Sequence, residues 1–162
     1  MAGNHDKALR EHVLFLLGGG GAHLDFDKAF AGLARKFRGA KPASIPYTPW
    51  RLLEHMRLAQ VDILDFCTNP KYQGKQWPAD YWPKVDAPGS DAEWEASLDQ
   101  FRRDLKRMQE LVKHTGTDLF AKIPWGEGQT YLREALLVAD HNAYHLGEIV
   151  VVRRALGAWD EP

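Results

Sequence analysis

The strongest constraint on the fold of this chain is an apolar stripe in the segment that follows Ser90. Its apolar residues alternate strictly at spacings of four and three positions: Trp94, Leu98, Phe101, Leu105, Met108 and Val112. That spacing places all six on one face of an α-helix that packs against neighbours at a shallow angle. Ser90-Asp91-Ala92-Glu93 is a capping box, a common helix start. We therefore predict one long helix from residue 90 to near Gly116.

Three further segments show the helical period. We expect helices over residues 4–18, 48–68 and 130–156. Asn4, Thr48 and Thr130 can each cap the first turn of their helix. Proline follows Thr48 at the first helical position, where its missing N–H costs nothing. Glycines end the first and the last of these helices.

A shorter amphipathic segment lies at about residues 25–37, where four apolar residues recur at helical spacing: Phe26, Phe30, Leu33 and Phe37. We expect one short accessory helix there. The sequence shows no sign of a β-strand. The three valines at 150–152 could suggest one, but they lie inside a helical pattern. At 162 residues the chain has the size of one domain. The sequence therefore predicts an all-α fold, a four-helix bundle forming a single domain over residues 1–162.

Two long connections join these helices, at about 69–89 and 115–129. The first carries Trp77, Tyr81 and Trp82 among four prolines. Loops of this length in a compact domain are often functional or well packed. We favour packing of the aromatic residues over one end of the bundle. A lid over a binding site is the alternative.

Composition and charge exclude several classes of function. The formal net charge is −1 and the basic residues are spread along the chain, so no basic stripe is available for nucleic acid. The longest apolar run near the start, at 13–17, is too short for a membrane span and unlike a signal peptide, so we expect a cytoplasmic protein. The single cysteine, Cys67, reads as a small buried residue without a chemical role.

The last helix carries an unusual number of ionisable residues on its inward stripe: Glu134, Val138, His141, His145, Glu148 and Val152. Burying unpaired polar groups costs several kcal/mol, so a polar or cationic group is expected there. His141 and His145 stand one turn apart on the same face. His55 falls on the apolar stripe of the 48–68 helix.

Three imidazoles from two helices would form an open face for a divalent metal ion. Zinc, nickel and ferrous iron all suit imidazole. Buried core histidines without a metal are the alternative. The other four histidines, His5, His12, His23 and His114, have ordinary structural explanations.

A metalloprotease is disfavoured, because Asn142 stands where an HExxH motif requires its glutamate base. Other candidate bases are Glu134, Glu148 and Asp62. We favour a different role for these carboxylates, which is to accept the free ring N–H of a metal-binding histidine.

Three stretches carry a resemblance to the DinB/YfiT-like superfamily of bacterial proteins. They are LLEHMRLAQVDILDF (52–66), QWPADYWP (76–83) and IPWGEGQTYLREALLVADHNAYHLGEIVVVRRALGAW (123–159). The resemblance implies a four-helix bundle with up-down-down-up connectivity, frequently a homodimer. It also implies a divalent metal, zinc or nickel, held by His55, His141 and His145.

The chain departs from this pattern at Glu148, where similar proteins often carry glutamine. The added carboxylate could be a fourth ligand, a general base, or a partner of a ligand. The resemblance implies a metal-dependent thiol S-transferase, using a low-molecular-weight thiol such as bacillithiol or mycothiol, or a hydrolase, acting on a small molecule. A non-catalytic dimeric metal-binding or stress-response module is the second hypothesis.

Overall fold

The computed structural model describes residues 2–19 and 21–159, and its regular structure there is helical. The helices are α1 (Ala2–Leu17), α2 (Phe26–Phe30), α3 (Arg35–Arg38), α4 (Pro49–Thr68), the 3-10 turn η1 (Ala79–Tyr81), α5 (Asp91–Lys113) and α6 (Tyr131–Ala155). The only β contact in this part of the chain is an isolated bridge between Lys122 and Thr130. The predicted all-α fold is confirmed. Among these helices, none is both long and apolar enough to cross a membrane.

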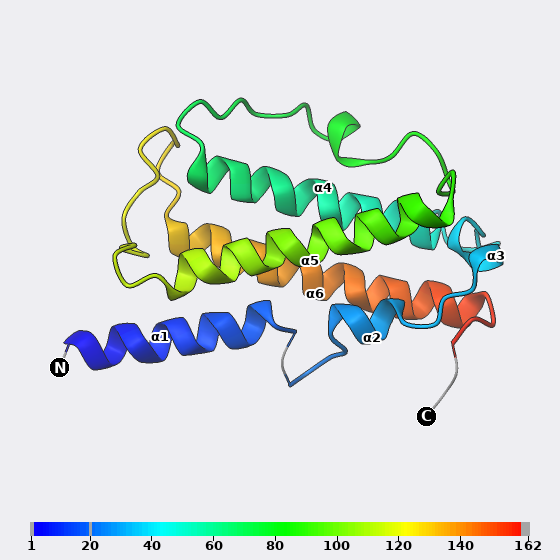
Figure 1. Ribbon diagram of the computed structural model, residues 1–162, viewed down its shortest axis with the longest axis horizontal. Coiled ribbons are helices and arrows are strands. Elements are labelled where there is room, and N and C mark those ends of the chain that lie inside the picture. The colour runs from blue at the N-terminus through cyan, green and yellow to red at the C-terminus, as the bar shows by residue number, and fades with distance from the viewer. Residues whose placement is uncertain (1, 20, 160–162) are drawn as a thin grey trace.

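Four long helices lie alongside one another (Figure 1), and α4 packs against both α5 and α6 while α1 packs against the other side of the same pair. Figure 1 also shows their directions: α1 and α6 run one way, and α4 and α5 run the other. Because α4 and α5 are parallel, the chain must return along the length of α4 before α5 begins. The connection at 69–90 makes that return and follows the outer side of α4. The sequence had led us to expect that this connection covers one end of the helices, and that prediction is wrong.

The predicted helix starts are confirmed for the three long helices that follow the N-terminal region. The hydroxyl oxygens of Thr48, Ser90 and Thr130 each accept a hydrogen bond from the backbone N–H three residues later, at 3.1, 3.1 and 3.2 Å. The carboxylate of Glu93 accepts from the N–H of Gly89, one residue before the expected partner of a capping box. These bonds satisfy donors that a helix leaves free at its first turn.

Two predictions near the N-terminus are wrong in detail. α1 already begins at Ala2, so Asn4 lies within its first turn and does not cap it. The accessory segment at 25–37 forms two short helices, α2 and α3, in place of one. Gly32 separates them with φ of +66°, a left-handed conformation that glycine adopts at little cost. The apolar spacing still predicted burial correctly for Phe26, Phe30 and Leu33.

The core joins α4, α5 and α6 through apolar packing and one buried amide relay. Trp94, Phe101 and Met108 of α5 are fully enclosed, as the apolar stripe predicts. Gln60 of α4 lies among these helices, 1% exposed. Its Nε2 donates to the carbonyl of Phe101 at 2.8 Å, and its Oε1 accepts from Nδ2 of Asn142 at 2.9 Å. A buried relay of this kind holds three helices in one register, because a shift of any of them leaves a polar group unpaired.

Two buried arginines connect helices through hydrogen bonds to backbone carbonyls. Arg10 of α1 donates to the carbonyls of Val112 at 2.6 Å, His114 at 3.1 Å and Thr117 at 2.7 Å, just where α5 ends. The carbonyls at the end of a helix lack partners within the helix and carry partial negative charge, so a guanidinium suits them. Arg153 of α6 donates to the carbonyl of Ala29 in α2 at 2.6 Å.

We expect Arg10→Met to lower the free energy of unfolding by about 2 kcal/mol, because bonds from a charged donor contribute about 1.5–3 kcal/mol. Lys7→Met on the exposed side of α1 is the matched control, and its effect should stay within about 0.5 kcal/mol. Urea unfolding followed by circular dichroism measures both. Equal effects of the two substitutions would contradict this role of Arg10.

Candidate metal centre

The structure brings the three predicted histidines together where α4 meets α6. His55 comes from α4, and His141 and His145 lie one turn apart on α6. Their ring nitrogens include one from each residue that all lie within 4.8 Å of one another. The closest approach joins Nε2 of His55 to Nε2 of His141 at 3.1 Å. The inward stripes read from the sequence therefore converge on one point.

The ring of His55 is fixed by the connection at 69–90. Its Nδ1 lies 2.7 Å from the carbonyl oxygen of Tyr81, which can only accept, so Nδ1 carries the proton. The lone pair of Nε2 is then directed at the other two histidines. The indole of Trp82 stacks on the imidazole with ring centroids 3.9 Å apart and planes 1° from parallel. Two consecutive residues of this connection therefore fix the tautomer and the tilt of a ring that α4 positions.

The ring of His145 is fixed by Glu148. Its Nδ1 lies 2.7 Å from Oε2 of Glu148, one turn further along α6. An ionised carboxylate accepts, so Nδ1 is the donor and Nε2 is left with its lone pair. Of the roles that the sequence left open for Glu148, this geometry matches the partner of a ligand. Carboxylate–histidine pairs of this kind fix the orientation of metal ligands in many proteins.

The donor set fits a divalent ion of the transition series. Zinc–imidazole bonds of 2.0–2.1 Å in a tetrahedral arrangement separate two ligand nitrogens by about 3.3 Å. The 3.1 Å between His55 and His141 is close to that value, although it also suits an N–H···N hydrogen bond. Three protein ligands are the number found in catalytic zinc sites, which keep a position for water or substrate.

Burial keeps all three imidazoles neutral near pH 7. Burial, and after it the neighbouring imidazoles of His145 and His55, together lower the pKa of His141 to about 4. Burial and the nearby His55 also lower the pKa of His145 to about 4. For His55, burial lowers the pKa while the Tyr81 carbonyl and the charge of Glu148 oppose it. Neutral imidazole is the form that binds metal.

The other two candidate bases are engaged elsewhere. Glu134 pairs with Arg133 at 2.6 Å. Asp62 accepts from the hydroxyl of Tyr81 at 2.6 Å and from that of Tyr72 at 3.2 Å. Neither carboxylate belongs to the group of residues that could share an ion with the histidines. Both line a cavity beside the cluster.

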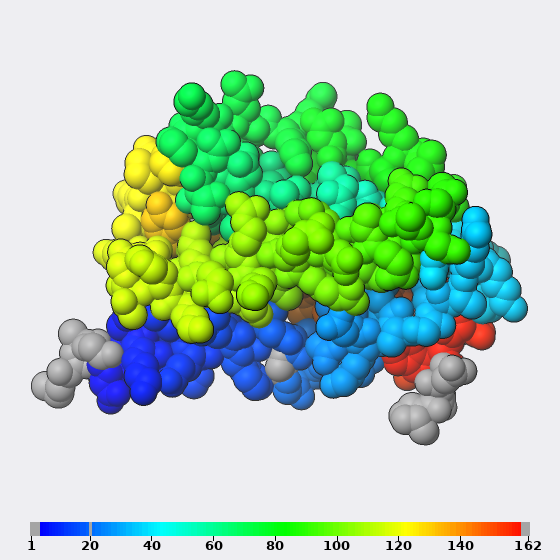
Figure 2. Space-filling model, in the orientation of Figure 1, coloured from blue at the N-terminus to red at the C-terminus, as the bar shows by residue number. Residues whose placement is uncertain are grey.

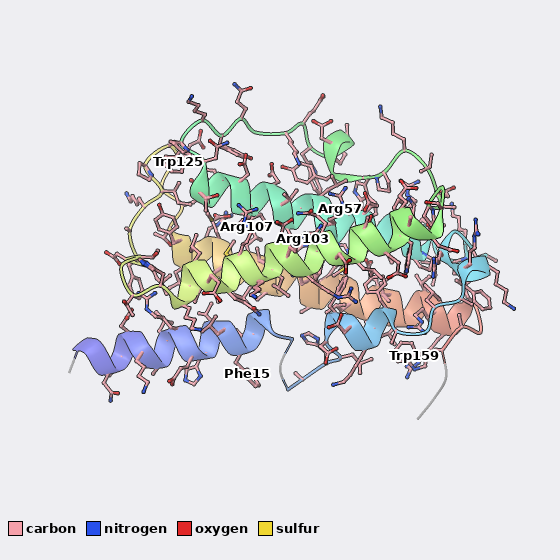
Figure 3. The ribbon with its side chains drawn as sticks, in the orientation of Figure 1. Phe15, Arg57, Arg103, Arg107, Trp125 and Trp159 are labelled. Atoms are coloured by element: carbon pink, nitrogen blue, oxygen red, sulfur yellow. The ribbon has the colours of Figure 1, made fainter. Side chains whose placement is uncertain are left out.

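That cavity has a volume of about 530 Å³, and His141 forms part of its wall. Much of the remaining wall is aromatic and comes from α4 and both long connections: Phe66, Tyr72, Trp77, Tyr81 and Trp125. Trp125 lies beside the end of α4 (Figure 3), where its Nε1 donates to the carbonyl of Phe66 at 2.7 Å. The cavity therefore lies between the cluster and the loops that close one side of the helices.

A second cavity, of about 300 Å³, is lined by parts of α1, α2, α5 and α6 and by none of the three clustered histidines. Figure 2 shows a hollow between α1 and α2, beneath α5, at whose base α6 is visible. Because none of the three clustered histidines lines this cavity, we assign it no part in the candidate metal centre.

The residues that the sequence set aside are indeed remote from the centre. His5, His12, His23 and His114 are all exposed and outside the cluster. Cys67 is 2% exposed, and burial raises the pKa of its thiol to about 12, so it is no nucleophile at neutral pH. The sequence reading missed the Tyr81 carbonyl and the stacked Trp82. The aromatic QWPADYWP stretch was the available signal, but it did not show which ring lies on which ligand.

Comparisons of the chain with protein-family models, with curated proteins and with solved structures find no match. The DinB/YfiT-like family accordingly stays a prediction from the motifs.

We expect the metal-free protein to lose stability as the pH falls from about 6.5 to 4. The pKa of an unfolded histidine is near 6.5, above the lowered values of His141 and His145, so the unfolded chain takes up more protons in this window. Between pH 7 and pH 5 the loss should be on the order of 2 kcal/mol for each of these two histidines. Urea unfolding in the presence of EDTA measures it.

The free energy of unfolding should depend less on pH in His141→Gln, because this variant has one histidine of lowered pKa fewer. His12→Gln, on the exposed side of α1, should keep the dependence of the wild type. An identical pH profile for wild type and His141→Gln would show that the cluster is not the cause.

Proposed function

We propose that this chain is a DinB/YfiT-like metalloprotein, a four-helix bundle with up-down-down-up connectivity whose histidine cluster binds a divalent metal ion. The opposed directions of the α1/α6 and α4/α5 pairs and the long return between α4 and α5 support the connectivity. The cluster of His55, His141 and His145 supports the metal. Zinc and nickel are the proposed ions, with ferrous iron as a third option.

We further propose that the protein is an enzyme, a thiol S-transferase or a hydrolase acting on a small molecule. The observation that carries this proposal is that the cluster of three histidines adjoins, through His141, a cavity large enough for a small organic molecule. A bound divalent ion supplies a Lewis acid that converts a thiol to thiolate, or water to hydroxide, near neutral pH.

The protein residues around the cluster have separable tasks in this proposal. His55 and His145 present Nε2 because the Tyr81 carbonyl and Glu148 hold their Nδ1 protons. Trp82 covers one face of the His55 ring, which keeps water away from that side. His141 is the cluster residue that also lines the cavity, so a substrate bound in the cavity would lie beside the cluster.

Metal binding is the first test. Equilibrium dialysis with zinc or nickel should show one ion for each chain. His55→Ala, His141→Ala and His145→Ala should each lower the affinity at least 100-fold, because each removes one of three ligands. His114→Ala is the matched control and should bind as the wild type does. Unchanged binding in all three cluster variants would exclude the centre.

The role of Glu148 is the second test. Glu148→Ala should lower metal affinity about 10- to 100-fold, as removal of a partner of a ligand typically does. Glu148→Gln keeps an acceptor for the His145 N–H, so its metal affinity should fall less than that of Glu148→Ala. The metal-loaded variants are also assayed for displacement of chloride from 1-chloro-2,4-dinitrobenzene by a low-molecular-weight thiol. A general base would show the opposite result, with activity lost in Glu148→Gln at unchanged metal affinity.

A non-catalytic dimeric module is the second candidate, favoured because residues 2–19 and 21–159 place no free nucleophile or base at the cluster. Cys67 is buried and Glu148 is bonded to His145. In that case the metal stabilises the fold or reports metal or stress status, chelation changes thermal stability or oligomeric state, and no substrate turns over. The homodimer and the cytoplasmic location both stay predictions, and sedimentation of the metal-loaded protein measures the former.

A further inference from the structure

The cavity beside His141 contains a buried carboxylate without a cationic partner. Asp62 is 8% exposed and lies in the cavity wall. Its hydrogen bonds come from the hydroxyls of Tyr81 and Tyr72. Within the described part of the chain, no lysine, arginine or histidine nitrogen lies within 4.0 Å of it.

No cation of the described chain segments contacts the carboxylate of Asp62 directly, although Lys75 and Arg107 line a second, smaller hollow that Asp62 also lines. Moving a carboxylate out of water is costly, and neutral donors offset less of that cost than a cation does. Both partners are neutral phenols, which donate to the carboxylate at 2.6 Å from Tyr81 and 3.2 Å from Tyr72. A ligand that brings a positive charge would therefore be stabilised here.

The other charges of the cavity favour the same sign of ligand. Arg133 is the only lysine or arginine among the lining residues, and it pairs with Glu134 at 2.6 Å. Glu127 adds a further negative charge at the exposed edge. An anionic ligand would meet this excess of negative charge, whereas a cation would be attracted.

The aromatic wall is suited to an ammonium group as well. Faces of tryptophan, tyrosine and phenylalanine attract cations through the ring quadrupole. Trp77 and Tyr81 lie with ring centroids 5.3 Å apart, and Trp77 is 68% exposed at the edge of the cavity. A cation already lies over one of these rings, because Nζ of Lys75 is 5.9 Å from the centroid of Tyr81.

We propose that this cavity binds the ammonium group of a small organic amine, with Asp62 as its counter-charge. Asp62 follows His55 by seven residues, which places it two turns away on the same side of α4, about 10 Å along the helix. An amine bound at Asp62 could therefore reach the histidine cluster only if it is about as long as three extended residues. That the amine must reach the histidine cluster rests on the proposed function. Recognition of the amine by Asp62 does not need a metal.

The test compares three probes that share a ring and a chain and differ in charge: 4-phenylbutylamine, 4-phenylbutanol and 4-phenylbutyrate. Calorimetric titration of the full chain in EDTA measures their affinities. The amine should bind at least tenfold more tightly than the alcohol, and the carboxylate should bind most weakly. Equal affinities for amine and alcohol, or a preference for the carboxylate, would overturn the proposal.

Variants assign the preference to particular side chains. Asp62→Asn keeps an acceptor for the two tyrosines and removes the charge, so affinity for the amine should fall about tenfold while that for the alcohol changes less than twofold. Asp65→Asn is the matched control, since Asp65 is exposed one turn further on and does not line this cavity. Unchanged amine affinity in Asp62→Asn would overturn the assignment.

A second variant keeps the proposal testable if Asp62→Asn does not fold. Trp77→Leu alters an exposed side chain and should lower affinity for the amine about fivefold, with a smaller effect on the alcohol. An equal loss for both probes would show that the ring contributes apolar contact only and would count against the proposal.

The outcome is separable from that of the proposed function. Preference for the amine in EDTA together with failure to bind zinc or nickel would overturn the metal centre alone. Metal binding without preference for the amine would overturn the present inference alone.

Discussion

The parallel course of α4 and α5 is the constraint on which the rest of this structure depends. Two consecutive helices that point the same way need a connection as long as the first of them, about 30 Å for the 20 residues of α4. The connection at 69–90 is therefore a structural necessity, and its course along α4 brings it past His55. The same segment supplies the carbonyl of Tyr81, the ring of Trp82 and two tyrosines bonded to Asp62. The connection that the parallel helices require is thus also the segment that supplies the surroundings of His55 and Asp62.

Polar groups inside this protein are placed where they join separate elements. The relay through Gln60 connects three long helices, and Arg10 connects α1 to the end of α5. The histidine cluster likewise joins α4 to α6 and, through Tyr81, to the loop. Each arrangement costs desolvation energy that only a correct alignment of the partners recovers. The alignment of the helices is therefore specified more sharply than apolar packing alone would require.

Much of the fold follows from local patterns in the sequence. Helix starts at Thr48, Ser90 and Thr130 depend on one hydroxyl and its near neighbours, and the stripe from Trp94 to Val112 depends on spacing alone. The break at Gly32 was not predicted, because apolar spacing reports which side is buried and not whether the backbone continues as a helix. A glycine in that segment was a visible but ambiguous signal.

Some residues of the candidate site could also be predicted from the sequence, and others could not. His55, His141 and His145 could be found because ionisable residues on inward stripes are costly and therefore informative. The two tyrosine partners of Asp62 could not be found, because they come from a loop whose course is determined by contacts distant in sequence. The same holds for the bond between His55 and Tyr81, whose acceptor is a backbone atom that every residue type possesses.

The hydrogen bond between His55 and the carbonyl of Tyr81 has a consequence for which mutations the protein can accept in evolution. A side-chain partner for His55 would be lost by a single substitution, but the backbone carbonyl at position 81 is retained whatever residue stands there. The orientation of this imidazole therefore tolerates replacement of loop side chains and is sensitive to insertions, deletions and changes of backbone path. The surroundings of the cluster can diversify in chemistry while the histidine itself stays in place.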